Sequence, residues 1–218
     1  MTLVPAAPQI ILFDLDNTLY APEYDLFSLI DCRINRFMEE VVGIAADDVD
    51  PLRRYYWQEY GVTLQGLIRH FDVDPEAYLH YVHDVDVTSR LVADPGLATI
   101  LAALPQRKVV FTNGSSAHAE RVLAALGIRQ EFEAIFDIRI ANYLPKPFFA
   151  PYEEIVTQLG TSPQSCVMIE DVAKNLAPAK TLGMATILVG GSDELPPYVD
   201  LRIDTIHEIS AALQLLQE

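Results

Sequence analysis

The chain has 218 residues, a length that suits one α/β domain or one such domain with a smaller insert. Half of the residues are hydrophobic and 21% are charged, as is typical of a globular protein with an ample core. The formal net charge of −16 predicts an acidic surface that repels polynucleotides and anionic membranes. We therefore expect neither a nucleic acid nor a membrane as a partner.

The cysteines and the N-terminal region indicate the cellular setting. Cys32 and Cys166 are far apart in the sequence and have no metal-ligand spacing, so we expect two reduced packing residues in a cytoplasmic protein. The N-terminal region has no basic stretch, and Asp14 and Asp16 interrupt its only apolar run. We therefore expect neither a signal peptide nor a membrane-spanning segment.

Short apolar runs alternate with helical patterns along most of the chain. The runs predict strands at Gln9–Phe13, Lys108–Phe111, Ala134–Ile138, Ser165–Ile169, Ala185–Val189 and Leu201–Ile203. The spacing of apolar residues predicts helices at Gly96–Leu104, Ser116–Leu126, Phe148–Leu159, Val172–Leu182 and Ile206–Leu215. Gly127, Gly160 and Gly183 stand where helix C-termini are expected. This alternation predicts a parallel, doubly wound α/β sheet that is covered by helices on both faces.

Helical patterns alone occupy the stretch between the first and the second predicted strand. The helices predicted there cover Asp25–Val42, Val49–Tyr60, Leu64–Phe71 and Pro75–His83. Such an insert would form a second small domain above the carboxyl edge of the sheet. We therefore predict a helical domain of residues 21–90 and a discontinuous core of residues 1–20 and 91–218.

The first strand ends in two carboxylates, Asp14 and Asp16, which are followed by Thr18. Open α/β proteins bind ligands at the carboxyl ends of their strands. Two carboxylates this close repel each other unless a cation or a shared proton lies between them, so the motif indicates a hard-metal site beside a carboxylate nucleophile. A simple turn is an alternative. A calcium loop is disfavoured because Thr18 and Leu19 stand where that loop needs an acid or amide and a glycine.

Three further polar motifs follow later strands. Thr-Asn-Gly at positions 112–114 precedes a predicted helix, where a hydroxyl and backbone N–H groups can bind an anion. Lys146 lies between two prolines that restrict its backbone direction. Glu170 and Asp171 close a fourth strand. Each motif alone has a plainer interpretation, namely a turn with a serine cap, a solvated lysine and, for Asp171, a helix cap. Together they predict a crevice at one sheet edge that suits a phosphoryl group.

In their order along the chain, these motifs resemble those of the haloacid dehalogenase superfamily of phosphohydrolases with an aspartate nucleophile. The residues that carry the resemblance are Asp14-x-Asp16-x-Thr18, Thr112, Lys146 and Glu170-Asp171. The helical insert is similar to the cap domain of that superfamily. A closer resemblance, to the pyrimidine 5′-nucleotidase subfamily, involves Phe13–Tyr20, Tyr55–Leu67, Tyr81–Asp84, Phe111–Gly114, and Glu170-Asp171 followed by Lys174-Asn175-Leu176. Val172 departs from this pattern, which has a serine after the acid pair.

The resemblance implies a mechanism. Asp14 would attack phosphorus to form an aspartyl-phosphate, and Asp16 would protonate the leaving oxygen and then activate water. Mg²⁺ would be held by Asp14, the backbone carbonyl of Asp16 and Asp171, with Glu170 helping directly or through water. True dehalogenases of the superfamily lack an aspartate at the position of Asp16, so its presence implies phosphate esters as substrates.

The same resemblance implies how phosphate is bound. Thr112 and the backbone amides of Asn113 and Gly114 would bind phosphate oxygens. Lys146 would neutralise phosphate charge and hold Asp14 in place. Thr18 would orient the loop of the first motif.

Aromatic residues of the insert are candidates for substrate specificity. Tyr56 and Tyr60 share one helix face, so their rings can stack on a nucleobase or pack in the insert's own core. We favour packing, because large aromatic side chains are mostly buried. Tyr20, at the hinge, and His83 are further candidates for substrate contact.

These features predict a Mg²⁺-dependent phosphatase of small phosphate esters, with pyrimidine nucleoside 5′-monophosphates as the favoured substrates. The first alternative is a phosphatase or mutase of phosphoglycolate or a sugar phosphate. A non-catalytic interaction protein on the same scaffold is the least favoured, because every chemical position is intact. The sequence leaves open whether the protein is a monomer or a homodimer.

Overall fold

The computed structural model describes residues 8–192 and 194–216. The predicted core reaches beyond them at both ends. Residues 1–7, which include the start of the region considered for a signal peptide, and residues 217–218 lie outside the described residues.

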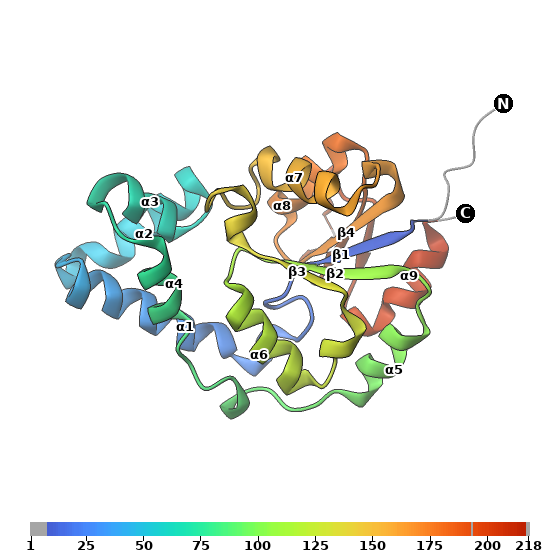
Figure 1. The fold of residues 1–218 in the computed structure, drawn as a ribbon, viewed down its shortest axis with the longest axis horizontal. Helices are drawn as coiled ribbons and strands as arrows, with labels where there is room; N and C mark the ends of the chain where they lie inside the picture. The colour runs from blue at the N-terminus through green and yellow to red at the C-terminus, as the bar shows by residue number, and fades with distance from the viewer. Residues whose placement is uncertain (1–7, 193, 217–218) are drawn as a thin grey trace.

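A parallel sheet of six strands forms the centre of the described structure (Figure 1). The strands are β1 (Ile10–Phe13), β2 (Arg107–Phe111), β3 (Ala134–Phe136), β4 (Cys166–Glu170), β5 (Ala185–Val189) and β6 (Leu201–Ile203). Their spatial order is β3-β2-β1-β4-β5-β6, and every neighbouring pair is parallel. The predicted doubly wound α/β fold is thus confirmed, and β1 lies between β2 and β4 at the reversal of strand order.

Helices cover both faces of the sheet, which explains why its central strands β1 and β4 are buried along their whole length. One face carries α5 (Pro95–Ala103), α6 (Ser116–Leu126) and α9 (Ile209–Leu215), and the other carries α7 (Phe149–Leu159) and α8 (Ala173–Leu182). Successive side chains of β1 alternate between the two hydrophobic clusters, with Ile11 and Phe13 in one and Ile10 and Leu12 in the other.

The ends of these elements follow local chemistry. The predicted glycines end α6, α7 and α8 in the left-handed conformation, with φ angles of 71°, 61° and 99°. The strand predicted to reach Ile138 ends at Phe136, because Asp137 accepts a hydrogen bond from the backbone of Arg139 and starts a 3-10 turn. The last predicted helix begins with a 3-10 turn at Ile206–Glu208 before α9.

The stretch between β1 and β2 is helical, as predicted. It contains α1 (Leu26–Arg36), which continues as a π-helical turn, then α2 (Ala46–Tyr60), α3 (Thr63–Phe71) and α4 (Pro75–Val82). We call α1–α4 the helical unit, and in Figure 1 it lies to the left of the sheet. It has a hydrophobic cluster of its own, which supports the proposed division into a core and an inserted helical domain.

The helical unit is tied to the segment that follows β3. Arg139 forms an ion pair with Glu76 of α4 at 2.7 Å, and the hydroxyl of Tyr143 donates to the same carboxylate at 2.6 Å. The side-chain amide of Gln65 in α3 donates to the carbonyl of Tyr143 at 2.6 Å. Ile138 packs in the hydrophobic cluster of the helical unit. The chain that leads to the predicted lysine loop is therefore held by two helices of the unit.

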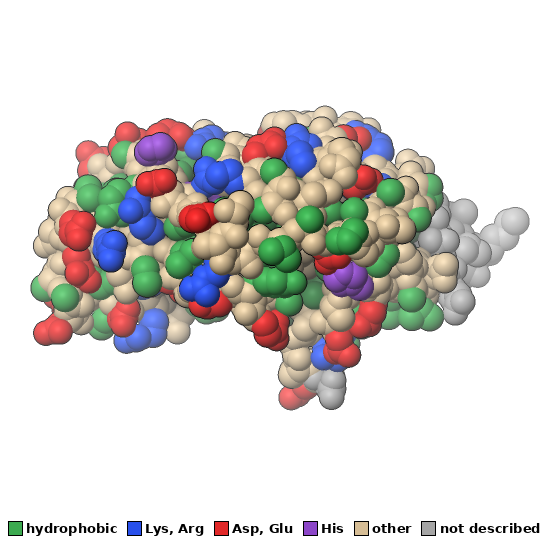
Figure 2. Space-filling view, turned by 90° about the horizontal axis from the view of Figure 1, so that it is seen from below, with side chains coloured by type: hydrophobic (Ala, Val, Ile, Leu, Met, Phe, Trp, Pro, Cys, Tyr) green, Lys and Arg blue, Asp and Glu red, His purple; other side chains and the backbone are tan. Residues whose placement is uncertain are grey.

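Charged side chains are spread over the face shown in Figure 2. In the face shown in Figure 2, acidic and basic side chains are interspersed over both parts of the molecule. Cys166 is buried in β4 as expected, whereas Cys32 is exposed on α1, so the packing role expected for Cys32 is wrong. No helix within the described residues combines the length and apolar character needed to cross a membrane.

Candidate active site

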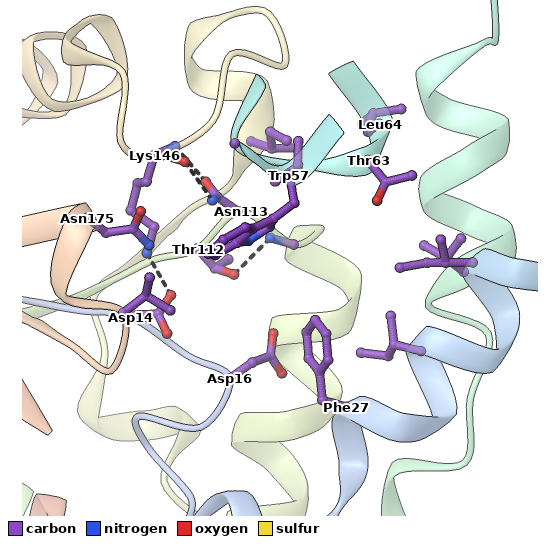
Figure 3. A pocket seen from close by; sticks show the side chains of 18 of the residues that line it. Asp14, Asp16, Phe27, Trp57, Thr63, Leu64, Thr112, Asn113, Lys146 and Asn175 are labelled. Atoms are coloured by element: carbon purple, nitrogen blue, oxygen red, sulfur yellow. Dashed lines mark hydrogen bonds and ion pairs between the residues drawn. The ribbon is translucent and has the colours of Figure 1, made fainter. Parts of the chain in front are cut away.

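A cavity of about 570 Å³ lies between the carboxyl ends of the strands and the helical unit. The core residues predicted from the sequence all line it: Asp14, Asp16, Thr112, Asn113, Gly114, Lys146, Glu170 and Asp171. Figure 3 shows Asp14, Thr112 and Lys146 on one side and Thr63 and Leu64 of α3 on the other. Segments that are distant in the sequence meet here because the strands are parallel and end at one edge.

Lys146 stands at the centre of the core wall. Its Nζ lies 2.6 Å from Asp14 Oδ1 and 2.7 Å from Glu170 Oε2, and it donates to the carbonyl of Phe111 at 2.7 Å. Asn113 holds the lysine backbone on both sides, since it accepts from the Lys146 N–H at 2.8 Å and donates to the Lys146 carbonyl at 3.1 Å. With a side chain only 1% exposed, this lysine is an internal counter-charge rather than a solvated one.

Three carboxylates crowd around that single cation. Ligand oxygens of Asp14, Glu170 and Asp171 lie within 4.8 Å of one another. Burial, with the neighbouring charge of Glu170, outweighs Lys146 and raises the pKa of Asp14 to about 7. Burial likewise raises the pKa of Glu170 to about 7 and that of Asp171 to about 6. The cluster is short of positive charge, and its hard oxygen donors suit a divalent cation such as Mg²⁺.

Asp171 is free to take part in that cluster. Helix α8 begins at Ala173 with Val172 as its N-cap residue and without a side-chain cap, so the helix-cap interpretation of Asp171 is wrong. The hydroxyl of Thr18 donates to Asp14 Oδ2 at 3.1 Å and also reaches Asp171 Oδ1 at 3.5 Å. Thr18 thus contacts the acids of both motifs.

The segment after β2 forms a turn and also lines the cavity. Thr112 Oγ1 accepts a hydrogen bond from the backbone N–H of Gly114 at 2.9 Å. A side chain at Gly114 would approach this oxygen and the Nε2 of His83 at 3.3 and 3.4 Å, so glycine keeps the space open. Ser115 accepts from the His118 N–H and caps α6. The serine cap considered for this segment therefore coexists with a loop that lines the cavity.

Asp16 lies in different surroundings from Asp14. Its Oδ1 accepts hydrogen bonds from the hydroxyl of Tyr20 at 2.7 Å and from Nε2 of His118 at 2.8 Å. Burial raises the pKa of Asp16, but the charge and hydrogen bond of His118 and the Tyr20 hydroxyl outweigh it, so the pKa is lowered. Tyr20 contacts the predicted acid itself.

His118 is the functional candidate that the sequence did not indicate. It lies in the first turn of α6, its side chain is 0% exposed, and its ring stacks on that of His83 at 4.8 Å between centroids. His83 ends α4, is buried and lines the cavity. The sequence signal that could have indicated His118 is that it is a polar residue on the same side of the helix as Ala119 and Val122, which are both buried.

The aromatic residues of α2 divide between packing and the cavity. Tyr56 is 2% exposed and belongs to the hydrophobic cluster of the helical unit, and Tyr60 contacts His70 at 3.0 Å. The cavity wall includes neither tyrosine, which agrees with the favoured packing interpretation. Trp57 lines the cavity instead, with an indole that is 49% exposed and lies 3.1 Å from Nζ of Lys174.

Comparison with known proteins gives a consistent set of relatives. A family model described as haloacid dehalogenase-like hydrolase matches residues 8–183. Phosphate metabolism protein 8 of Saccharomyces cerevisiae is 28% identical over 197 residues, which are 84% of this chain and 61% of the yeast protein. This chain thus spans about three fifths of that relative. Phosphoglycolate phosphatases of Chromobacterium violaceum and Rhodospirillum rubrum are 27% and 26% identical, over 90% and 94% of this chain and 92% and 89% of theirs.

Solved structures share the fold. CbbY of Rhodobacter sphaeroides, crystallised in complex with phosphate, has a TM-score of 0.67 and 23% sequence identity, covering 95% of this chain and 99% of that chain. L-2-haloacid dehalogenase of Xanthobacter autotrophicus has a TM-score of 0.62 and 16% identity, covering 95% of this chain and 98% of that chain. At these identities the likeness concerns the fold alone.

Proposed function

Because this chain belongs to the haloacid dehalogenase-like hydrolase family, we propose that it is a phosphatase of small phosphate monoesters with Asp14 as its nucleophile. The observation that carries this proposal is the buried contact of Lys146 with Asp14 and Glu170, beside a third acid, Asp171. A buried lysine among crowded carboxylates provides the charge environment that a phosphate dianion needs.

The proposal includes Mg²⁺. The ion would be held by the carboxylates of Asp14, Asp171 and Glu170 and by the backbone carbonyl of Asp16. The raised pKa values of the three acids, which are caused chiefly by burial, support this assignment, since a bound cation would stabilise their ionised forms. When bound, Mg²⁺ would offset the repulsion between a carboxylate and a phosphate dianion.

The side chains would perform the reaction in two displacements. A carboxylate oxygen of Asp14 forms a bond to phosphorus while the bond from phosphorus to the leaving oxygen breaks, and Asp16 gives its proton to that oxygen. Asp16 then takes a proton from water as the water oxygen attacks phosphorus and releases Asp14. The hydroxyl of Thr112 and the backbone amide of Asn113 would donate to the phosphate oxygens, and Lys146, whose three hydrogens bond to Asp14, Glu170 and the Phe111 carbonyl, would neutralise their charge.

Pyrimidine nucleoside 5′-monophosphates are the substrates that we propose within this class. The cavity is large enough for a nucleotide, and the half-exposed indole of Trp57 offers a surface on which a base can stack. Phosphoglycolate is the second candidate, because two relatives carry that activity in their names. Arg54 and Lys174, which line the cavity and have no carboxylate partner among the described residues, would meet its second anionic group.

The test is phosphate release from a panel of esters with and without Mg²⁺. The panel holds UMP, CMP, dTMP, AMP, GMP, phosphoglycolate and hexose phosphates, and Asp14→Asn is the control variant. We expect Mg²⁺-dependent release that is fastest for the pyrimidine nucleotides and absent from the variant. Fastest release from phosphoglycolate or a hexose phosphate would retain the chemistry and overturn the nucleotide assignment. No release from any ester would overturn the phosphatase proposal.

A further inference from the structure

One oxygen of Asp16 is fully engaged and the other is free. Oδ1 accepts two hydrogen bonds, from Tyr20 at 2.7 Å and from His118 at 2.8 Å. Oδ2 has no hydrogen-bond partner among the described residues, and Asp16 lines the cavity, where Figure 3 shows its carboxylate between Asp14 and Phe27. A carboxyl oxygen that accepts two donors cannot also carry a hydrogen directed at them, so Asp16 can be protonated only at Oδ2.

We propose that His118 and Tyr20 are positioning residues that clamp Oδ1 of Asp16 and thereby present Oδ2 as the atom that exchanges the catalytic proton. This inference rests on the proposed phosphatase function. It gives a role to two residues that form or break no bond in the proposed reaction. The proton on Oδ2 passes to the leaving oxygen as the bond from that oxygen to phosphorus breaks. Oδ2 then receives a proton from water as the water oxygen bonds to phosphorus.

The two donors keep their roles throughout this cycle. An ionised or a protonated Asp16 offers Oδ1 as an acceptor in both states, so neither donor has to move when the proton leaves. Burial raises the pKa of Tyr20 far above its usual value, which keeps its hydroxyl a donor. In this arrangement Oδ1 is the acceptor, so the His118 ring carries its hydrogen at Nε2.

His118 is held by more than its bond to Asp16. Its backbone lies in the capped first turn of α6, and its ring stacks on His83 of the helical unit. Its Nδ1 is buried and has no partner among the described residues, which is unfavourable for a side chain that merely packs. The hydrogen bond between Nε2 and Asp16 explains why a histidine stands here although its Nδ1 is unpaired.

The test uses leaving groups that differ in their need for a proton. The Mg²⁺-loaded protein, His118→Ala and Tyr20→Phe are compared on 2,4-dinitrophenyl phosphate, whose leaving group departs as a stable anion. They are also compared on the alkyl phosphate that the unaltered protein hydrolyses fastest. We expect kcat/KM for the alkyl ester, which reports the step that releases the leaving group, to fall by about 10²-fold in His118→Ala and less in Tyr20→Phe. For the dinitrophenyl ester we expect kcat/KM to fall by less than about threefold, because the later hydrolysis of the aspartyl-phosphate, which is common to both esters, does not enter this quantity.

Two further variants separate positioning from a general structural role. His118→Gln retains an N–H that can reach Oδ1 and should recover part of the alkyl-ester activity. His207→Ala removes another histidine that binds an aspartate, Asp94 at 3.0 Å, and should leave both activities unchanged. Tyr20→Phe keeps the inference testable if His118→Ala does not fold, because it removes only a hydroxyl.

The outcomes distinguish the inference from the function on which it rests. Equal losses of kcat/KM on both esters, or no loss on either, would overturn the clamp while leaving the phosphatase assignment intact. Hydrolysis of neither ester by the unaltered protein would overturn the phosphatase assignment and the clamp together. A ¹⁵N NMR signal showing the His118 ring without hydrogen at Nε2 would also overturn the clamp.

Discussion

Asp14 and Asp16 are separated by one residue, yet their carboxylates lie in opposite surroundings. Asp14 is crowded by Glu170 and Asp171 and has its pKa raised to about 7, whereas the donors around Asp16 hold its pKa below the usual range. The proposed roles require the reverse, because a nucleophile must be ionised and an acid must carry a proton. The polypeptide alone therefore leaves Asp14 only partly ionised near neutral pH and Asp16 ionised.

This contrast indicates what a bound cation and a bound substrate would supply. A divalent cation beside Asp14 would lower its pKa, and a phosphate dianion beside Asp16 would raise that of the acid. The two carboxylates would thus acquire their working protonation states only in the loaded site. Such a site would be inert toward stray reactions when empty.

Replacing the nucleophile should have the largest effect. We expect Asp14→Asn to lose at least about 10⁴-fold in kcat on every ester, since the amide cannot form the bond to phosphorus. Steady-state phosphate release measures this, and circular dichroism checks that the fold is retained. Asp47→Asn, an exposed change in the first turn of α2, is the matched control. Residual activity near that of the unaltered protein would assign the nucleophile elsewhere.

Replacing the acid should be selective. We expect Asp16→Asn to lose about 10³-fold in kcat/KM, which reports the step that releases the leaving group, on an alkyl phosphate but much less on 2,4-dinitrophenyl phosphate, because only the alkyl leaving group needs a proton. The ratio of the two losses is the measurement. Equal losses would show that the two aspartates do not differ in the way their surroundings indicate.

Removing the central cation should affect both activity and stability. Lys146→Gln leaves the carboxylates of Asp14 and Glu170 without their buried partner, and we expect kcat to fall by about 10²-fold or more. We also expect a loss of about 3 kcal/mol in the free energy of unfolding at pH 8. Chemical denaturation measures the second effect. Lys180→Gln, which breaks an exposed pair with Asp200, should change neither quantity appreciably.

Adjacent aromatic residues of α2 offer a second contrast. Trp57→Ala should raise KM for a nucleotide about tenfold with little change in thermal stability, because the half-exposed indole faces the cavity. Tyr56→Ala should destabilise the protein by about 3 kcal/mol, because that ring is packed in the helical unit. Kinetics and thermal unfolding of both variants provide the comparison. An unchanged KM in Trp57→Ala would remove the base-stacking role from the nucleotide proposal.

The smallest effect should be the pH dependence of stability. In the metal-free fold the pKa values of Asp14 and Glu170 are raised to about 7. The contribution of these two groups to stability is therefore fully present below the usual pKa range of carboxyl groups, and it is lost as the pH rises through about 7. Saturating Mg²⁺ should therefore raise the melting temperature by about 5 °C at pH 8 and by less than about 2 °C at pH 5. Differential scanning fluorimetry measures both shifts. A larger Mg²⁺-induced shift in melting temperature at pH 5 than at pH 8 would contradict the proposed shortage of positive charge around these carboxylates.

The sheet and its edge were predictable because each rests on local chemistry. Continuous apolar runs require burial on two faces, and polar residues at their ends then share one edge, which places Asp14, Lys146 and Glu170 at one cavity. Strand ends were less accurate where side chains compete for the backbone, as Asp137 does after β3. Proline neighbours predicted a restricted Lys146, but its backbone bonds to Asn113 join loops that only the tertiary fold brings together.

Side-chain direction in the helices was harder to predict. Tyr56 and Trp57 are adjacent, and composition does not say which one faces the unit's own cluster. The glycine at position 66, within α3, was one signal present in the sequence. In the structure a side chain at Gly66 would lie 2.1 Å from the Tyr56 ring, so only glycine leaves room for that ring. A glycine within a helix can mark the close approach of a large neighbour. The bond from His118 to Asp16 spans 102 positions, and no local pattern predicts it.

The contacts of Glu76 with Arg139 and of Gln65 with Tyr143 determine which segments of this protein can be exchanged with those of its relatives in a chimaera. A chimaera that exchanged residues 21–90 alone would remove both partners of the segment that leads to Lys146, although that segment belongs to the core by sequence. The natural unit of exchange is therefore discontinuous, comprising the helical insert together with residues 137–146. Redesign of substrate preference should transplant the two pieces as one module.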